Sequence, residues 1–202
     1  SELVYNTATA GDVTPGFYYW DGTKWVRLSI SSSTSSNDWA LLGNAGTTAG
    51  TNFIGTTDNQ DLIFKRNNIQ SGKISTTNTS LGVNSLAPAT TRNRNTAMGT
   101  EAMYLIVNGD DNTAIGYQAL RTGTNGARNV AIGNNTLMNN TTGGDNIAVG
   151  MQSLQSNTTG NNNVAVGRNS LYSNTSGSDN SAFGMQSLQS HTGSSYTALG
   201  YL

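Results

Sequence analysis

From residue 78 to the end of the chain, a short block of apolar and small residues recurs between polar turns. Each block reads Asn-x-Ala-ψ-Gly, where ψ is apolar. The blocks stand at residues 95–99, 112–116, 129–133, 146–150, 163–167 and 180–184, with variants at 78–82 and 197–200. The closing glycines are 17 residues apart from Gly82 to Gly184, and only the last step to Gly200 is one residue shorter. A constant period of this length predicts a solenoid or a fibre.

Each unit also has a second half of the form Gly-x-x-(Ala/Ser/Thr)-(Leu/Met), as in residues 116–120. A polar turn, such as residues 139–145, separates it from the next unit. The pattern predicts two strands of about four residues per unit, with a sharp bend at the glycine and one wider loop.

Side chains of a strand point alternately to its two faces, which divides the first strand into two sets. The second and fourth positions, such as Val130 and Ile132, form an apolar face that we expect to lie inside the coil. The other face carries Asn, then Ala in every unit but the first, where it is Ser80, then Gly. Because such small residues allow close approach, we expect three copies to pack these faces around one axis. A single-chain, three-sided β-helix has a similar turn length, but it needs three strands per turn.

Stacked coils place identical positions about 4.8 Å apart, so we expect ladders of like side chains. The first expected ladder contains the asparagines that open the units, namely Asn78, Asn95, Asn112, Asn129, Asn146, Asn163 and Asn180. The second is mostly amides, namely Asn84, Glu101, Gln118, Asn135, Gln152, Asn169 and Gln186. Stacked amides hydrogen-bond along the axis and fix the register. The alternative role of the asparagine row is to hold an ion or a ligand.

Residues 1–28 predict an aromatic β-hairpin. Asp21-Gly22 separates the run Phe17-Tyr18-Tyr19-Trp20 from the segment 23–28, and Asp-Gly favours tight hairpin turns. Residues 3–5 are expected to add a third strand, with Pro15-Gly16 as the bend.

The segment between this hairpin and the repeats divides in two. Residues 29–37 are almost all serine and threonine and predict a linker. Residues 38–77 predict a small β module, in which Asn67-Asn68 is the turn between strands at 62–66 and 69–74. Residues 78–202 then form the repeat shaft.

Composition narrows the function classes. Only 10% of the residues are charged, against about 25% in ordinary globular domains, and the net charge is −1. Nucleic acid is therefore an unexpected partner. The chain has no cysteine, which excludes disulfides and thiolate metal sites. No apolar run approaches the roughly 18 residues of a membrane span, so we expect no membrane insertion. Because the chain ends partway through a unit, we expect it to be a fragment.

The repeat unit resembles the head repeats of trimeric autotransporter (YadA-like) adhesins, which form a left-handed parallel β-roll. The 17-residue form, as in residues 112–120, is similar to repeats in tail-fibre-domain proteins of Bacteroidetes and their phages, as are residues 52–64 and the hairpin at 19–26. This resemblance implies an all-β homotrimeric fibre, extracellular, on a cell surface, a phage tail or a contractile injection particle. Its N-terminus is expected to contact a baseplate or fibre protein.

Few residues of this sequence could support enzymatic catalysis. His191, the single histidine, replaces a loop asparagine and has no evident nucleophile beside it. Asp110-Asp111 is the one adjacent acidic pair, and it falls in a loop where Asp and Asn are common; a depolymerase spike would need such a carboxylate pair. We therefore expect no enzyme, no cofactor and no metal site.

The aromatic hairpin is the best candidate for ligand binding. Tyr18, Trp20 and Trp25 are suited to stacking on surface glycan. The competing interpretation is a hydrophobic knob at a trimer axis or a docking surface for a partner protein. A structural shaft is the first functional hypothesis, and a glycan-binding module is the alternative.

Overall fold

The computed structural model describes residues 3–6, 16–20, 22–28, 54–86, 93–123 and 125–201. These ranges contain thirteen β-strands and no helix. No membrane-spanning helix is therefore present in them. The chain separates into two compact units, Ser1–Gly55 and Thr56–Leu202, which are taken one at a time below.

The first unit holds a three-stranded antiparallel sheet in the order β1-β2-β3. Its strands are β1 (Leu3–Asn6), β2 (Gly16–Trp20) and β3 (Trp25–Leu28). The predicted hairpin and third strand are confirmed, and Gly22 in the turn has a φ of 104°. The expected bend at Pro15, the linker at 29–37 and residues 38–53 lie outside the described residues.

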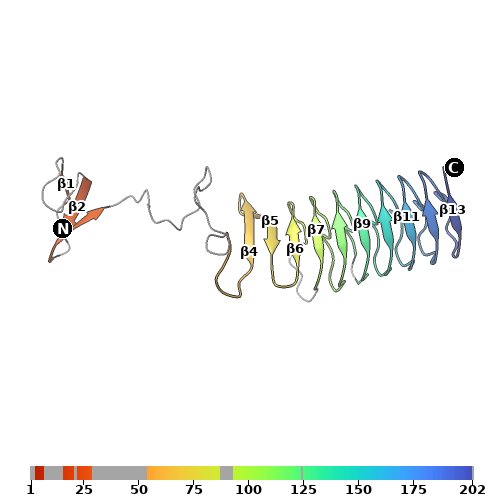
Figure 1. Cartoon of the computed structure of the whole chain (residues 1–202), viewed down its shortest axis with the longest axis horizontal. Helices are drawn as coiled ribbons and strands as arrows, with labels where there is room; N and C mark the ends of the chain where they lie inside the picture. Colours follow the sequence, from red (N-terminus) through yellow and green to blue (C-terminus); the bar gives the residue numbers. More distant parts are fainter. Residues whose placement is uncertain are drawn as a thin grey trace. The chain divides into compact units, whose positions relative to one another are not determined.

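The second unit holds a ten-stranded sheet that runs in sequence order from β4 to β13 (Figure 1). It begins with the antiparallel pair β4 (Leu62–Arg66) and β5 (Ile69–Ile74). The turn between them is Asn67-Asn68, with φ values of 48° and 61°, as predicted. The remaining strands are β6 (Thr79–Leu81), β7 (Thr96–Met98), β8 (Thr113–Ile115), β9 (Val130–Ile132), β10 (Ile147–Val149), β11 (Val164–Val166), β12 (Ser181–Phe183) and β13 (Thr197–Leu199).

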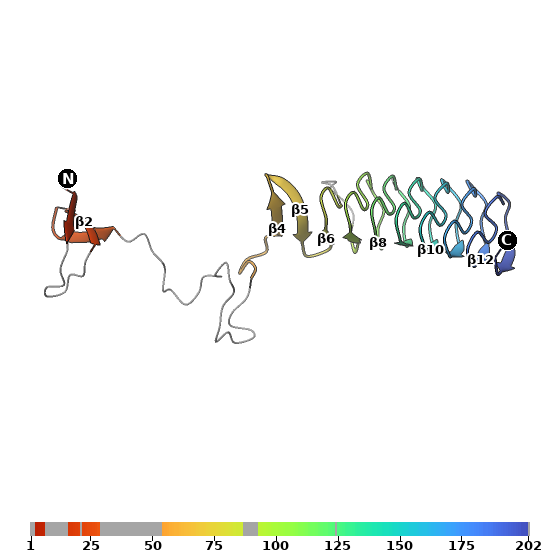
Figure 2. The same ribbon diagram turned by 90° about the horizontal axis from the view of Figure 1, so that it is seen from above.

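From β6 onward the sheet is a parallel β-solenoid, which confirms the predicted fold class. Ala131 pairs with Ala148, and Ala148 with Ala165, so each coil repeats the one before it. The coils follow one another along the unit in Figure 2, with one strand per coil and the rest of each unit returning as a loop.

The prediction of two strands per unit is wrong. Each coil has one three-residue strand, and the second half of the unit consists of turns. The reason is visible in the backbone, because Asn135 and Leu137 have φ values of 53° and 51°. Left-handed residues at alternate positions reverse the direction of the chain and are incompatible with an extended strand.

The predicted orientation of the strand faces is also wrong. The alanine face points into the coil: Ala131 and Ala148 have no solvent exposure and pack in one core with Leu137 and Leu154. The apolar face points outward, where Ile132 is 37% exposed. The physical reason is that the coil interior is narrow. The leucines of the turns, such as Leu137, already occupy it, so the strand that faces them can add only small side chains such as alanine.

The glycine that ends each strand makes close stacking possible. Gly167 has a φ of 131°, and a side chain there would run into the backbone carbonyl of Gly184 in the next coil. Because glycine alone combines this conformation with such close backbone contact, it recurs at every coil.

Candidate functional site

One face of the sheet in the second unit is largely apolar and is not covered by any other described part of the chain. We call it the outer face; it consists of the outward-pointing residues of β4–β13. Its main column contains Phe64, Gly72, Leu81, Met98, Ile115, Ile132, Val149, Val166, Phe183 and Leu199. Most of its large side chains are well exposed, with Phe183 at 42%. A contiguous apolar face of this kind marks an interaction surface in soluble proteins.

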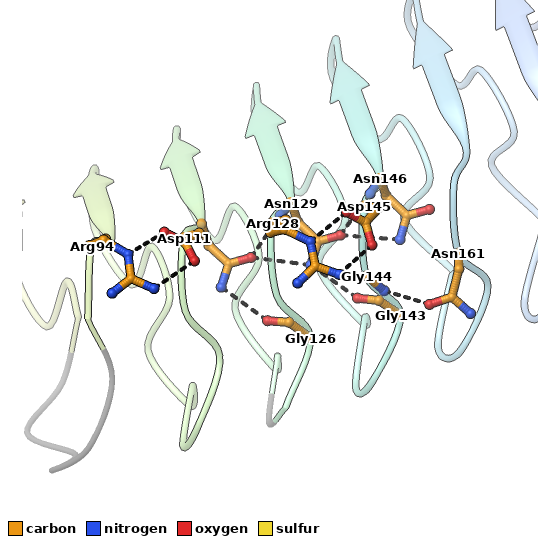
Figure 3. A network of polar contacts seen from close by, with 11 residues as sticks. Arg94, Asp111, Gly126, Arg128, Asn129, Gly143, Gly144, Asp145, Asn146 and Asn161 are labelled. Carbon is orange, nitrogen blue, oxygen red and sulfur yellow. Dashed lines mark hydrogen bonds and ion pairs between the residues drawn. The ribbon is translucent and has the colours of Figure 1, made fainter.

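The asparagines that open the units lie together in one ladder inside the coil. The backbone N–H of Asn146 donates to Oδ1 of Asn129 at 3.0 Å, and its Nδ2 donates to the carbonyl of Gly160 at 2.9 Å. The same backbone bond links every member from Asn78 to Asn180 (Figure 3 shows the middle of the row). The ladder fixes the spacing of the coils, because each oxygen is used by the next coil.

A second internal row of asparagines escaped the sequence interpretation. Asn140, Asn157 and Asn174 are fully buried, and Asn157 Nδ2 donates to Oδ1 of Asn140 at 2.9 Å. Each also donates to the carbonyl of the glycine three residues later, as from Asn140 to Gly143 at 2.8 Å. The available signal was their 17-residue spacing within segments that we assigned to polar loops.

The predicted mostly amide row does not form a continuous ladder. Of its members, only Gln118 and Glu101 are joined by a side-chain hydrogen bond, at 2.8 Å. Arg121 also donates to Glu101 at 2.9 Å, and these hydrogen bonds hold the pKa of that carboxyl below its ordinary value. The side-chain oxygens of Asn135 and Asn169 are buried without a hydrogen-bond partner. Alternating Asn and Gln differ in length, so their amide groups do not align.

A column of charged residues stands immediately before the asparagine ladder. Arg94 binds Asp111 through two hydrogen bonds of 2.6 and 2.9 Å. Arg128 binds Asp145 likewise, at 2.6 and 2.7 Å (Figure 3). Hydrogen bonding to the guanidinium groups lowers the pKa of both carboxyls. The two residues of each pair are 17 positions apart in the sequence. They become neighbours only when the coils stack.

The pairs predict a pH-dependent contribution to stability. Because the pKa of Asp111 and Asp145 is lower in the folded state, the stabilisation is complete above the ordinary carboxyl pKa and is lost as pH falls through the folded value. The double variant Asp111→Asn/Asp145→Asn should melt below the parent at pH 7 and together with it near pH 2. Thermal circular dichroism over this range measures the difference. An equal gap at both pH values would contradict the assignment.

The N-terminal aromatics do not form one exposed surface. Tyr18 is buried, at 7% exposure, whereas Trp20 and Trp25 are 41% and 45% exposed. The two indoles pair across β2 and β3, edge to face, with ring centroids 5.5 Å apart. Tyr5 and Phe17 make a second ring pair at 4.7 Å. The predicted residues thus include two exposed rings that stand at an angle to each other.

The other polar residues considered for catalysis, Asp110, Asp111 and His191, make contacts within the fold. Asp110 accepts a hydrogen bond from the backbone N–H of Asn93 at 2.7 Å, while Asp111 binds Arg94. His191 follows the second asparagine row, and its ring lies 3.8 Å from that of Tyr196. Within the described ranges, no three His, Cys, Asp or Glu side chains are grouped so that they would hold a metal ion.

Comparison with known proteins gives one match, at the N-terminus. Residues 1–38 match the family described as the phage tail like trimerisation region. Searches of curated proteins and of solved structures return no match to this chain. The matched segment includes the whole three-stranded sheet. Together with the β-solenoid, it fits a structural role in a trimeric, phage tail-like fibre; the likeness to adhesin heads and to Bacteroidetes proteins stays a prediction.

Proposed function

We propose that this chain is the shaft of a homotrimeric tail fibre or surface adhesin, non-catalytic and extracellular, which mediates attachment. The observation that carries the proposal is the outer face, whose main column is apolar on nine of the ten strands, with Gly72 on β5, and which is uncovered in the single chain. The N-terminal match to a trimerisation region supports the same assembly from a separate part of the sequence.

In the proposed trimer, the outer faces of three copies meet around one axis. This arrangement replaces our expectation that the alanine faces meet, since those faces are already buried within each coil. A three-fold ring is closed, so no outer face is left in water. Burial of side chains such as Ile115 and Ile132 contributes roughly 25 cal/mol per Å² of apolar surface, and it is repeated at every coil.

If the outer faces meet in a trimer, charged substitutions on them should prevent its assembly. The chain should sediment at three times 21.1 kDa. Ile115→Glu/Ile132→Glu should abolish the trimer, because it would bring six carboxylates together in an apolar core. Thr142→Glu, on an exposed loop position, is the matched charge control and should leave the trimer intact. Analytical ultracentrifugation at micromolar concentration measures both, and a folded monomer of the parent chain would sink the proposal.

Glycan binding by the N-terminal sheet is the second candidate, and the exposure of Trp20 and Trp25 favours it. Aromatic rings with free faces stack on the apolar faces of sugars. A glycan array with the parent chain, Trp20→Ala and Trp25→Ala tests this role. Binding that both variants retain would assign the aromatic sheet to trimer formation or to a fibre partner instead.

A further inference from the structure

The proposed trimer brings two edges of the solenoid together. Around a three-fold axis the contacts are head to tail, so the end of a strand in one copy meets the start of a strand in the next. Two columns therefore face each other. The pre-strand column is Arg94, Asp111, Arg128, Asp145, Asn162 and Asp179. The post-strand column, which follows the strand-ending glycines, is Thr100, Tyr117, Asn134, Met151, Arg168 and Met185.

The post-strand column has a single charge. Tyr117, Met151 and Met185 are exposed apolar residues that follow the strand ends. Arg168 is also exposed, and it forms no ion pair with any residue that the structure describes. It is thus a cation without a counter-ion at the margin of an apolar surface.

The pre-strand column has a single unbalanced charge as well. Asp111 and Asp145 each bind an arginine one coil earlier, at Arg94 and Arg128. At the next such position the sequence has Asn162 in place of arginine. Among the described residues, the carboxylate of Asp179 accepts one hydrogen bond, from Asn162 Nδ2 at 3.0 Å. No cation that the structure describes therefore pairs with Asp179 within the chain.

These two charges belong to neighbouring coils. Arg168 stands two residues after β11, and Asp179 stands two residues before the adjacent strand β12. Their levels differ by one coil, about 4.8 Å, which an arginine side chain spans easily. Within one chain they stand at opposite ends of the strands, on the order of 15 Å apart, so they do not pair there.

We propose that Arg168 of one copy binds Asp179 of the next, so that three such ion pairs ring the trimer. This inference rests on the proposed trimer. The other described charges of the pre-strand column are neutralised within each chain. On the coil of Arg168 itself the pre-strand residue is the uncharged Asn162, and one coil in the other direction Asp145 is already bound to Arg128. Asp179 is therefore the acid of the pre-strand column that is left for Arg168 of the neighbouring copy.

A charge-swap series on the full chain tests the pair. Arg168→Asp and Asp179→Arg should each lower the trimer-dissociation midpoint by about 3 °C or more, because each places like charges together. The double variant Arg168→Asp/Asp179→Arg should recover most of this loss. Both single effects should shrink in 1 M NaCl, where the Debye length is about 3 Å. Losses that simply add in the double variant would overturn the pair.

Disulfide trapping tests the same contact independently, since the chain has no cysteine of its own. Arg168→Cys/Asp179→Cys should yield covalent dimers and trimers on mild oxidation, and neither single variant should. Bridging within one chain is excluded by distance, because a disulfide needs Cα atoms within about 7 Å. A parent chain that sediments as a monomer would refute the trimer itself. A trimer that neither cross-links nor recovers in the swap would refute only the pair.

Discussion

Gly167→Ala is expected to lower the free energy of unfolding by about 4 kcal/mol or to prevent folding of the last coils. Two effects add at this position. The φ of 131° lies outside the conformations that an L-residue with a side chain adopts readily. The new methyl group would also meet the carbonyl of Gly184, a backbone group that cannot turn aside.

Gly144→Ala is the matched control for this prediction. Its φ is not in the left-handed region, and the nearest atom to a methyl group there is the carbonyl oxygen of Ala127, at 3.2 Å. We expect a change below about 1 kcal/mol for this variant. Guanidinium unfolding at fixed protein concentration compares the two. Equal midpoints for both variants would show that the stacking of the strand-ending glycines is unimportant.

Asn146→Ala is expected to cost about 3 kcal/mol of folding free energy. Oδ1 of Asn146 accepts from the backbone N–H and from Nδ2 of Asn163, both at 3.0 Å. Its Nδ2 donates to Gly160 and to Oδ1 of Asn129. Removal of the amide leaves buried polar groups in two neighbouring coils without partners, and it also opens a cavity.

Two further variants separate hydrogen bonding from packing. Asn146→Leu keeps a similar volume without the polar atoms, so it should be at least as harmful as alanine. Stability equal to the parent would reduce the ladder to space filling. Asn139→Ala is the control of the same residue type, because Asn139 makes no side-chain hydrogen bond within the described part of the chain; a change below about 0.5 kcal/mol is expected.

The period of this fold and the turn between β4 and β5 were predictable from sequence, because both depend on local chemistry. The 17-residue spacing gave the coil, and Asn67-Asn68 gave the β4–β5 turn. The orientation of the faces was not predictable in the same way. The alternation of side chains along a strand shows which residues share a face. It does not show which face points into the coil; the width of the coil interior decides that Ala131, and not Ile132, is buried there.

The remaining features depend on the stacked structure. Leu137 adopts a left-handed conformation that leucine rarely takes, so its propensity predicted a strand where the chain turns. Asn140 looked like an ordinary loop residue, yet it is fully buried. Arg128 and Asp145 are distant in sequence, and their pairing follows only from the one-coil offset.

The repeated register also determines how such a shaft changes in length. Because Ala131, Ala148 and Ala165 have equivalent neighbours on both sides, duplication of one 17-residue unit would add a coil without a new type of contact. Each duplication would extend the shaft by about 4.8 Å and each deletion would shorten it equally. The number of repeat units therefore sets the length of the shaft, and recombination between units would change that length in steps of one coil.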